Sequence, residues 1–468
     1  MWYIFGRSDI TITNNMEVFM QKLRHVILSV LLGCMLTTVG GEKARAVITD
    51  FGAVGDGKTV NTEAIAKALD HLKTAGGGEL VIPKGEFISG KIILIDNLTI
   101  RLEDGAVLKA SPDIKDHLYI KYYTPFLNFH FIYGKNIKNL HITGPGTLDG
   151  NGRGYWQDVY INGTPFEKMK QRPIYYSDVL RPKSERPVLL FLDGCTDIRM
   201  DNLKVSNSAA FTLWFVGCRR VKLDNIFIRN LRYGPNTDAI DIDCTSDVEI
   251  SNCDIEAGDD CIAIKSDPYR TNTDVPSENI YVHDCKFSAE TCAIRIGYEG
   301  DAPIRNVKFK NIYVRDTRHG IDILSIVPKS NVRVKYGTPI ENLHFDNFTM
   351  EEVGQAFFIW AGNEPGKTGH TGYIRNLVAE NMNITSLGTS FIGGEKEGII
   401  GPVVLRNVKM HVANPPGMPA TKKFAAMPSH WGDWWKSGGL RVLRADVKME
   451  NCNITCDHKG FEAIEIMK

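Results

Sequence analysis

The sequence lacks an excess of either charge, because 55 Lys and Arg residues balance 55 Asp and Glu residues in a chain of 468. A balanced chain has no overall positive field that would attract nucleic acid or an anionic membrane. The sequence also lacks C-x-x-C pairs and histidines at metal-ligand spacing, which argues against a zinc site. We therefore expect no nucleic-acid partner and no bound metal.

Long hydrophobic runs are absent as well. The apolar stretch 26–32 is too short to span a bilayer, so we expect no transmembrane segment. Basic residues after Met20 precede this stretch and an A-x-A sequence at 44–46 follows it, which is typical of an export signal. The letters LLGC ending at Cys34 also resemble a bacterial lipoprotein box. We expect residues 1–46 to be a leader and the protein to be exported to the periplasm or cell surface, either soluble or lipid-anchored through Cys34.

A complete disulfide framework is not expected, because an odd number of cysteines, nine, follows the leader. Cys253, Cys285 and Cys452 occupy one position of an internal repeat. Such a repeated register predicts small buried residues that stack on one another.

A repeat of the form apolar-x-apolar-x-Asn runs through most of the chain, for example in IRMDNLKV, VKLDNIFI, VEISNCDI and VKFKNIYV. Its period-two alternation predicts strands, with the Asn at a turn. Asn202 and Asn225 are 23 residues apart, and Asn252 follows after 27. Units of this length without helices between them predict an all-β fold, a solenoid of parallel coils about 4.8 Å apart. Residues one repeat apart then stack, and the turn asparagines can form a hydrogen-bonded ladder.

One amphipathic helix is predicted at the start of the fold, with Asn61 or Thr62 as its N-cap and the glycines at 76–78 ending it. The open apolar end of a solenoid needs a cover, and this helix is the natural cap. We predict a single domain over 47–468.

Aspartates recur at the entrance to two successive repeats, in PNTDAIDID and EAGDDCIAIKSD. Asp260 follows Asp238 by 22 residues, one coil, and Asp259 is their neighbour. Three crowded carboxylates repel, so at least one should keep its proton near neutral pH. A protonated acid beside ionised partners can cleave a glycosidic bond, because one group protonates the leaving oxygen and another activates water. The nearby Asp241, Asp243 and Asp247 are expected to be turn or surface residues.

These motifs, together with FGAVGDGKT and GTLDGNG, resemble glycoside hydrolase family 28, the pectin-degrading polygalacturonases. The resemblance implies a right-handed parallel β-helix, no metal or cofactor, and hydrolysis with inversion. It implies that Asp259 is the general acid and that Asp238 and Asp260 position and deprotonate water. Asn236 of the NTD motif is expected to contact substrate. Spacing alone leaves inversion and retention open.

The resemblance breaks at two later blocks, Gly-His-Gly and Arg-Ile-Lys, because Cys292 replaces the histidine while Asp322 and Leu324 replace the two cations. Those cations bind galacturonate in the family, so we do not expect a standard polygalacturonase. The replacement of the histidine by Cys292 is similar to rhamnogalacturonan hydrolases of the same family, and this resemblance implies a rhamnogalacturonan-type or side-chain substrate in preference to plain polygalacturonate. Arg295 is either a relocated substrate contact or a stacked ion pair with Asp322. Lys265 is expected to face the groove.

Trp434 belongs to an aromatic cluster in HWGDWWKSGG, where it could stack on a sugar or pack beneath the solenoid's end. The resulting hypothesis is an exported, monomeric glycosidase that degrades cell-wall pectin. Two alternatives are a non-catalytic carbohydrate-binding β-helix and a polysaccharide lyase or epimerase on the same fold.

Overall fold

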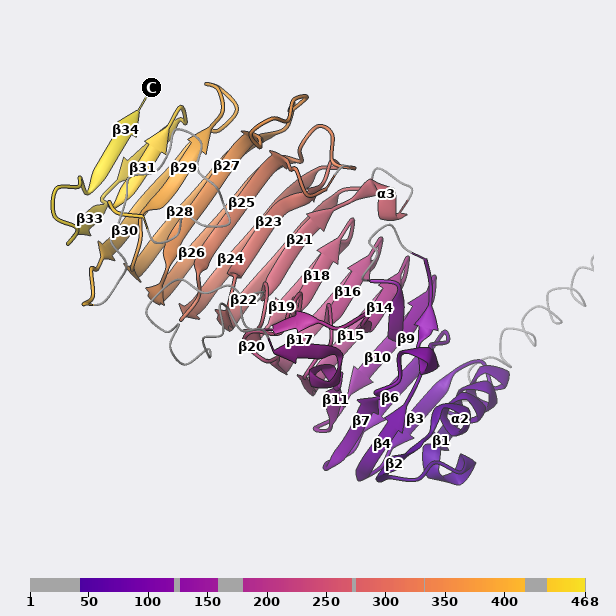
Figure 1. Ribbon diagram of the computed structural model, residues 1–468. Helices are drawn as coiled ribbons and strands as arrows, with labels where there is room; N and C mark the ends of the chain where they lie inside the picture. Colours follow the sequence, from indigo (N-terminus) through magenta and orange to yellow (C-terminus); the bar gives the residue numbers. More distant parts are fainter. Residues whose placement is uncertain are drawn as a thin grey trace, which may run out of the picture. The chain divides into compact units, whose positions relative to one another are not determined.

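The computed structural model describes residues 43–121, 127–158, 180–271, 275–331, 333–416 and 436–467. Apart from Lys43, these belong to one compact unit, Ala44–Lys468. Strands dominate the unit and stack in register along one axis (Figure 1). Within the described part of the chain, no helix is both long and apolar enough to cross a bilayer.

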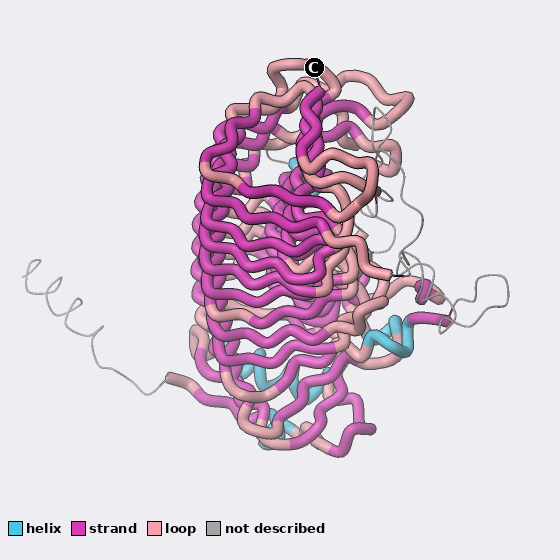
Figure 2. The backbone as a smooth tube through the Cα atoms, turned by 90° about the vertical axis from the view of Figure 1, so that its left-hand side faces the viewer, coloured by secondary structure: helices cyan, strands magenta, loops and turns pink. Residues whose placement is uncertain are grey.

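Two sheets, parallel throughout except where β8 runs antiparallel to β9, form the walls of the coils. Figure 2 shows their strands running side by side from one coil to the next. The larger, sheet A, has 19 strands. Its strands are β1 (Arg45–Val47), β2 (Asp56–Val60), β3 (Gly78–Ile82), β4 (Gly85–Ser89), β6 (Leu98–Leu102), β7 (Ala106–Ala110), β10 (Lys138–Thr143), β11 (Thr147–Asp149), β15 (Thr196–Ser206), β17 (Arg219–Arg229), β19 (Ser246–Ser251), β20 (Asp254–Ala257), β22 (Ser277–Ala289), β24 (Ile304–Arg315), β26 (Pro339–Val353), β28 (Tyr373–Ser386), β30 (Val403–Val412), β32 (Val447–Glu450) and β33 (Asn453–Cys456).

Sheet B has 13 strands and receives one from each successive coil over most of its length. Its strands are β5 (Ile92–Ile93), β8 (Leu118–Tyr119), β9 (Phe129–Lys135), β14 (Pro187–Asp193), β16 (Leu213–Val216), β18 (Ile240–Asp243), β21 (Ile262–Ser266), β23 (Cys292–Gly300), β25 (His319–Val327), β27 (Gln355–Asn363), β29 (Ser390–Gly394), β31 (Leu440–Leu443) and β34 (Ile464–Met467). A separate antiparallel pair joins β12 (Trp156–Asp158) to β13 (Leu180–Pro182).

The predicted capping helix is present as α2 (Thr62–Thr74), with Asn61 at the N-cap and Ala75 at the C-cap. Its apolar face, including Ile65, Leu69 and Leu72, is buried in the core at the β1 and β3 end of the coils. The Asn61 side chain does not cap the helix, because it bonds instead to the backbone of the preceding turn. The other helices are short: η1 (Ile48–Phe51), η2 (Ile114–Asp116), η3 (Gly152–Tyr155) and α3 (Pro268–Thr271).

The asparagine ladder is confirmed. Asn225 donates to Asn202 at 2.7 Å and Asn347 donates to Asn311 at 2.8 Å, each from a side-chain amide to the amide oxygen one coil earlier. These residues have positive φ, a conformation that Asn tolerates better than other non-glycine residues. Cys253 and Cys285 are buried in the apolar core as predicted, whereas Cys452 is half-buried against it.

Candidate active site

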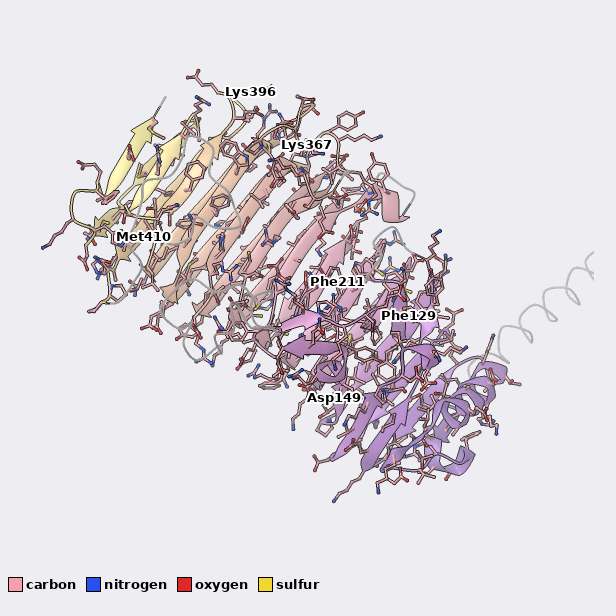
Figure 3. The ribbon with its side chains drawn as sticks, viewed as in Figure 1. Phe129, Asp149, Phe211, Lys367, Lys396 and Met410 are labelled. Atoms are coloured by element: carbon pink, nitrogen blue, oxygen red, sulfur yellow. The ribbon has the colours of Figure 1, made fainter. Side chains whose placement is uncertain are left out.

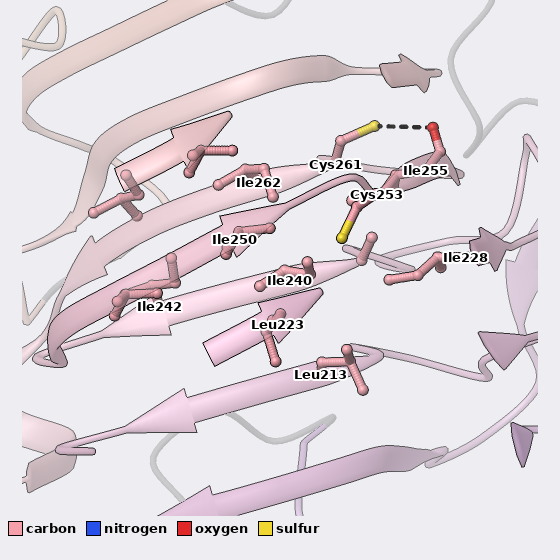
Figure 4. Close-up of a cluster of buried hydrophobic side chains, with 14 of the residues drawn as sticks. Leu213, Leu223, Ile228, Ile240, Ile242, Ile250, Cys253, Ile255, Cys261 and Ile262 are labelled. Carbon is pink, nitrogen blue, oxygen red and sulfur yellow. Dashed lines mark hydrogen bonds between the residues drawn. The ribbon is translucent and has the colours of Figure 1, made fainter. Parts of the chain in front are cut away.

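The three aspartates lie at the starts of β18 and β21, on adjacent coils. Ile240 pairs in register with Ile262, and the amide of Ala239 donates to the carbonyl of Asp260 at 2.8 Å. This register stacks Asp238 on Asp260, as the 22-residue spacing predicts. Figure 4 shows why the strand starts are fixed: Ile240, Ile262 and Cys261 lie in the apolar cluster, and the Cys261 thiol donates to the carbonyl of Ile255 at 3.7 Å.

A glycine allows the two acidic turns to approach each other. The Gly258 amide donates to the Thr237 hydroxyl at 3.2 Å, and that hydroxyl donates to the Gly234 carbonyl at 2.8 Å. A Cβ at Gly258 would lie 2.4 Å from the Thr237 oxygen, closer than real contacts allow. Gly258 therefore brings the turn that carries Asp259 against the turn that carries Asp238.

Asp238 is a buried carboxyl with one polar partner and one oxygen without a hydrogen bond. Only 4% of the residue is exposed. Its Oδ2 lies 3.4 Å from Lys265 Nζ, whereas Oδ1 has no hydrogen-bond partner among the described residues. Burial raises the pKa of Asp238 to about 6, with Lys265 opposing the shift and the charge of Asp260 adding to it. This carboxyl can gain or lose a proton near neutral pH.

Asp259 is the half-exposed member of the cluster, so the cluster reaches the protein surface through it. Its Oδ1 lies 2.6 Å from the Thr291 hydroxyl oxygen. Desolvation raises the pKa of Asp259 well above its usual range, and the charges of Asp238 and Asp260 add to the shift. This shift favours the protonated form of Asp259, which can give its proton to a group that approaches from the surface.

Asp260 lies between a cation and a hydroxyl. Arg295 Nε donates to Asp260 Oδ2 at 2.7 Å, and the Thr291 hydroxyl lies 2.7 Å from Oδ1. Both Asp260 and Arg295 are buried, and their close contact places a positive charge directly beside the Asp260 carboxyl. The cluster thus combines an acid whose pKa is raised with a neighbouring carboxyl that contacts a cation.

Lys265 lies inside the cluster and not on an open groove, because only 2% of it is exposed. Its Nζ is 2.8 Å from Asp241 Oδ1 and 3.4 Å from both Asp238 Oδ2 and Glu299 Oε1. The ammonium also lies 4.0 Å from the ring centroid of Phe211. Lys265 is the central cation for three carboxyls.

The expectation that Asp241 and Asp243 are turn or surface residues is wrong. Both are fully buried in β18, while Asp247 is exposed as expected. Asp241 pairs with Lys265, and Asp243 Oδ1 accepts the backbone amide of Asp267 at 2.8 Å. Neighbouring coils and their loops cover this strand on both faces, which its own sequence does not reveal.

Arg295 is 7% exposed and its guanidinium is surrounded by protein partners. Besides Asp260, it contacts Asp322 Oδ2 at 3.3 Å and Cys292 Sγ at 2.9 Å. Arg295 also pairs in register with Asp322, so the expected stacking of these two residues is confirmed. A substrate contact for Arg295 or Lys265 remains a prediction.

Three buried residues, Cys292, His319 and Asp322, have donor atoms within 4.8 Å of one another, close enough for a metal ion. The guanidinium of Arg295 contacts two of these three donors. A second cation placed among them would be repelled by this fixed charge. We interpret the group as the outer part of the ion network around Asp260.

Asn236 has a left-handed backbone with φ of 53°, and its Oδ1 accepts from Arg186 Nη2 at 3.0 Å. The same buried guanidinium donates to the carbonyls of Ala209 and Pro235, so Arg186 fixes the turn that carries Asp238.

Trp434, the predicted aromatic contact, lies outside the described residues. Arg186, Thr291 and Glu299 were not predicted from the sequence. Thr291 could have been found, because it directly precedes Cys292 and lies one coil from Asp259 at the same position of the repeat.

The surface hollow lined by Asp254, Glu256, Lys286 and Tyr313 lies along sheet A and contains none of the three acids. Its charged side chains come from exposed or half-exposed positions. Chemistry is therefore assigned to the aspartate cluster, where burial and like charge shift protonation, and not to the hollow.

Comparison with known proteins gives the family. Residues 78–391, more than half of the chain, match the model described as glycosyl hydrolases family 28. The chain is 28% identical over 403 residues to a "Probable polygalacturonase" of Vitis vinifera, covering 79% of this chain and 74% of that protein. It is 25% identical over 328 residues to an "Exopolygalacturonase" of Zea mays, covering 67% and 68% respectively.

Solved structures show the same fold. An exopolygalacturonase of Thermotoga maritima aligns with a TM-score of 0.63 at 23% identity, over 80% of this chain and 89% of that one. A family 28 exopolygalacturonase of Yersinia enterocolitica aligns with a TM-score of 0.64 at 20% identity, over 91% and 78%. The predicted right-handed parallel β-helix is thus confirmed. The chain belongs to glycosyl hydrolases family 28 and is a glycoside hydrolase.

Proposed function

We propose that this family 28 glycoside hydrolase cleaves a pectic polysaccharide or oligosaccharide with inversion, using Asp259 as general acid while Asp238 and Asp260 position and deprotonate the attacking water. The observation that carries the proposal is the contrast within one cluster. The pKa of Asp259 is raised well above its usual range, whereas the pKa of Asp238 is raised only to about 6 and Asp260 contacts the Arg295 guanidinium at 2.7 Å. The same residue type can thus act as a general acid at one position and activate water at another, because burial and neighbouring charges differ between the positions.

The proposed reaction uses the proton of Asp259 and one water molecule. Asp259 donates its proton to the glycosidic oxygen as the bond to the anomeric carbon breaks. Water attacks that carbon from the opposite side, held by Asp260 and by Asp238 Oδ1, the oxygen without a hydrogen-bond partner among the described residues. Asp238 takes the proton that the water loses. Release of the products and exchange of protons with solvent restore the starting state.

The substrate is proposed to be of the rhamnogalacturonan or side-chain type. The names of the curated relatives support a pectic substrate. However, Leu324 is fully buried in an apolar cluster and Asp322 is buried beneath Arg295, so neither position offers a cation to a galacturonate carboxylate. Arg295 itself is engaged by Asp260 and Asp322. Plain polygalacturonate is therefore expected to be a poor substrate.

The deciding experiment is a product profile of the full protein on a panel of pectic fragments. We expect new reducing ends without ultraviolet-absorbing unsaturated products, and an inverted anomer by proton NMR at early times. We also expect activity to fall below about pH 6, where Asp238 is protonated and cannot accept the proton of water. It should fall again at alkaline pH as Asp259 loses its proton.

Other results would contradict the proposal in distinct ways. Unsaturated products would indicate a lyase, and tight binding without any product would indicate a carbohydrate-binding protein. High activity on polygalacturonate would contradict the proposed substrate preference, which is argued from the cations that Asp322 and Leu324 replace. A retained anomer would overturn the proposed roles of Asp238 and Asp260.

For localisation, we propose a lipoprotein anchored at Cys34 in preference to cleavage after the A-x-A sequence. Strand β1 begins at Arg45, two residues before the expected domain start at 47. Ala46 is buried and paired with Leu80, and the Ala44 carbonyl accepts the Glu79 amide at 2.7 Å. Cleavage after Ala46 would remove these contacts, whereas cleavage before Cys34 would retain them.

Expression in a bacterial host that processes lipoproteins tests this assignment. The purified protein should carry a diacylglyceryl group on Cys34 by mass spectrometry, and it should partition with membranes. Cys34→Ala should release it or block its processing. A mature N-terminus at Val47 in the wild-type protein would be incompatible with the proposal. The monomeric state remains a prediction, which size-exclusion chromatography with light scattering can check.

A further inference from the structure

We propose that Thr291 is a positioning residue that assigns the proton to Asp259 by donating its own hydroxyl hydrogen to Asp260. This inference rests on the proposed function of the three aspartates and adds a residue that the family motifs do not contain. Thr291 stands where the first glycine of the Gly-His-Gly block is expected, directly before Cys292. A glycine there would supply no hydroxyl.

The Thr291 hydroxyl makes two close contacts with carboxyl oxygens but has only one hydrogen to donate. Thr291 Oγ1 lies 2.6 Å from Asp259 Oδ1 and 2.7 Å from Asp260 Oδ1. Both are ordinary O–H···O hydrogen-bond distances. A threonine hydroxyl has one hydrogen to donate and lone pairs to accept with, so it can donate to only one of the carboxyls. The other contact needs a hydrogen from the carboxyl itself, which means that one of the two aspartates is protonated.

The surrounding charges decide which one. Arg295 donates to Asp260 Oδ2 at 2.7 Å, so Asp260 is the carboxylate and accepts the threonine hydrogen. Among the described residues, no ion pair places a cation on Asp259. Asp259 is therefore the carboxylic acid, and its O–H donates to Thr291 Oγ1. The resulting chain runs from the Asp259 proton through the hydroxyl to Asp260 and Arg295.

Burial and a backbone hydrogen bond hold the Thr291 side chain in position between the two aspartates. It is 4% exposed, and its carbonyl accepts the amide of His319 at 2.8 Å in the next coil. Its branched Cβ restricts χ1, so the hydroxyl has few other directions available. When Asp259 gives its proton to the leaving oxygen, the same hydroxyl can turn its hydrogen toward the new carboxylate. Thr291 then stabilises the charge that forms on Asp259.

The test compares Thr291→Val, which keeps the shape and removes the hydroxyl, with Thr291→Ser, which keeps the hydroxyl. In Thr291→Val, the carboxylate that forms on Asp259 loses the hydroxyl that stabilises it, so the alkaline limb of the pH–activity profile should move to higher pH. We expect the acidic limb, which belongs to Asp238, to stay in place and kcat/KM at the optimum to fall about tenfold. Thr291→Ser should retain the wild-type limbs.

A spectroscopic readout separates this inference from the proposed function. Infrared spectra should contain a C=O stretch of a protonated carboxyl at neutral pH that is absent in Asp259→Asn. This band should shift to higher frequency in Thr291→Val, because the acid loses its hydrogen-bond acceptor, but not in Thr291→Ser. An unmoved alkaline limb together with an unshifted band would overturn the role of Thr291. A band that shifts as expected in a protein without hydrolytic activity would support the proton assignment and overturn only the proposed reaction.

Discussion

Replacing Asp259 with asparagine is expected to lower kcat on a pectic substrate by about 10²–10⁴-fold, while the protein stays folded. The amide has nearly the same shape as the acid but has no proton to give to the glycosidic oxygen. Folding should be unharmed, because the substitution removes a carboxyl whose pKa is raised by burial and by its acidic neighbours. Steady-state kinetics at the pH optimum, with thermal unfolding in parallel, measures both effects.

Comparing substrates with good and poor leaving groups tests the role of Asp259 as the acid more directly. A substrate whose aglycone is a good leaving group needs little protonation, so Asp259→Asn should lose far less activity on an activated aryl glycoside than on the natural linkage. Asp238→Asn should lose activity on both, because water must still be deprotonated. Asp247→Asn is the matched control, since Asp247 is an exposed aspartate near the same strands. Normal turnover by Asp259→Asn on the polysaccharide would exclude Asp259 as the acid.

The second large effect is expected from Lys265→Met, which removes the central cation of the buried cluster. At pH 8 we expect a loss of about 3–5 kcal/mol in the free energy of unfolding, because Asp238 and Asp241 keep their burial and lose their partner. Activity should also fall, since without the ammonium the pKa of Asp238 rises above about 6 and the base is protonated at neutral pH.

The pH dependence of this loss has a definite sign. A buried carboxyl whose pKa in the folded state is raised above its unfolded value makes the folded state bind more protons. Its penalty is therefore present above the folded-state pKa and disappears as the pH falls below it. Denaturant unfolding should accordingly show a larger difference between Lys265→Met and wild type at pH 8 than at pH 5.

Two further variants separate charge from packing. Lys265→Met combined with Asp241→Asn should recover part of the stability at pH 8, because one of the unpaired carboxyls is gone. Lys222→Met is the matched control, since Lys222 forms an exposed ion pair with Glu249 at 2.9 Å and should contribute little. A loss for Lys265→Met that is the same at both pH values would mean that the residue acts through packing alone.

The sequence alone determined the periodic features of this protein. Alternating apolar residues and turn asparagines at intervals such as that between Asn202 and Asn225 specify parallel coils, because each repeat can bury its apolar side only by stacking on the next. In a parallel stack, residues one repeat apart must be neighbours. For this reason the register of the repeats was enough to place Asp238 on Asp260, 22 residues later, and Arg295 on Asp322, 27 residues later.

Only the tertiary structure decided which side chains share a proton or a charge. The burial of Asp241, the position of Lys265 among three carboxyls and the contact of Thr291 with two acids depend on how far neighbouring coils and loops cover each strand. The alternation of apolar and polar residues along one strand cannot reveal this burial, because both faces of the strands at the site are buried. Protonation follows from burial and from distances of about 3 Å between side chains, and these are set by packing between coils that no single stretch of sequence contains.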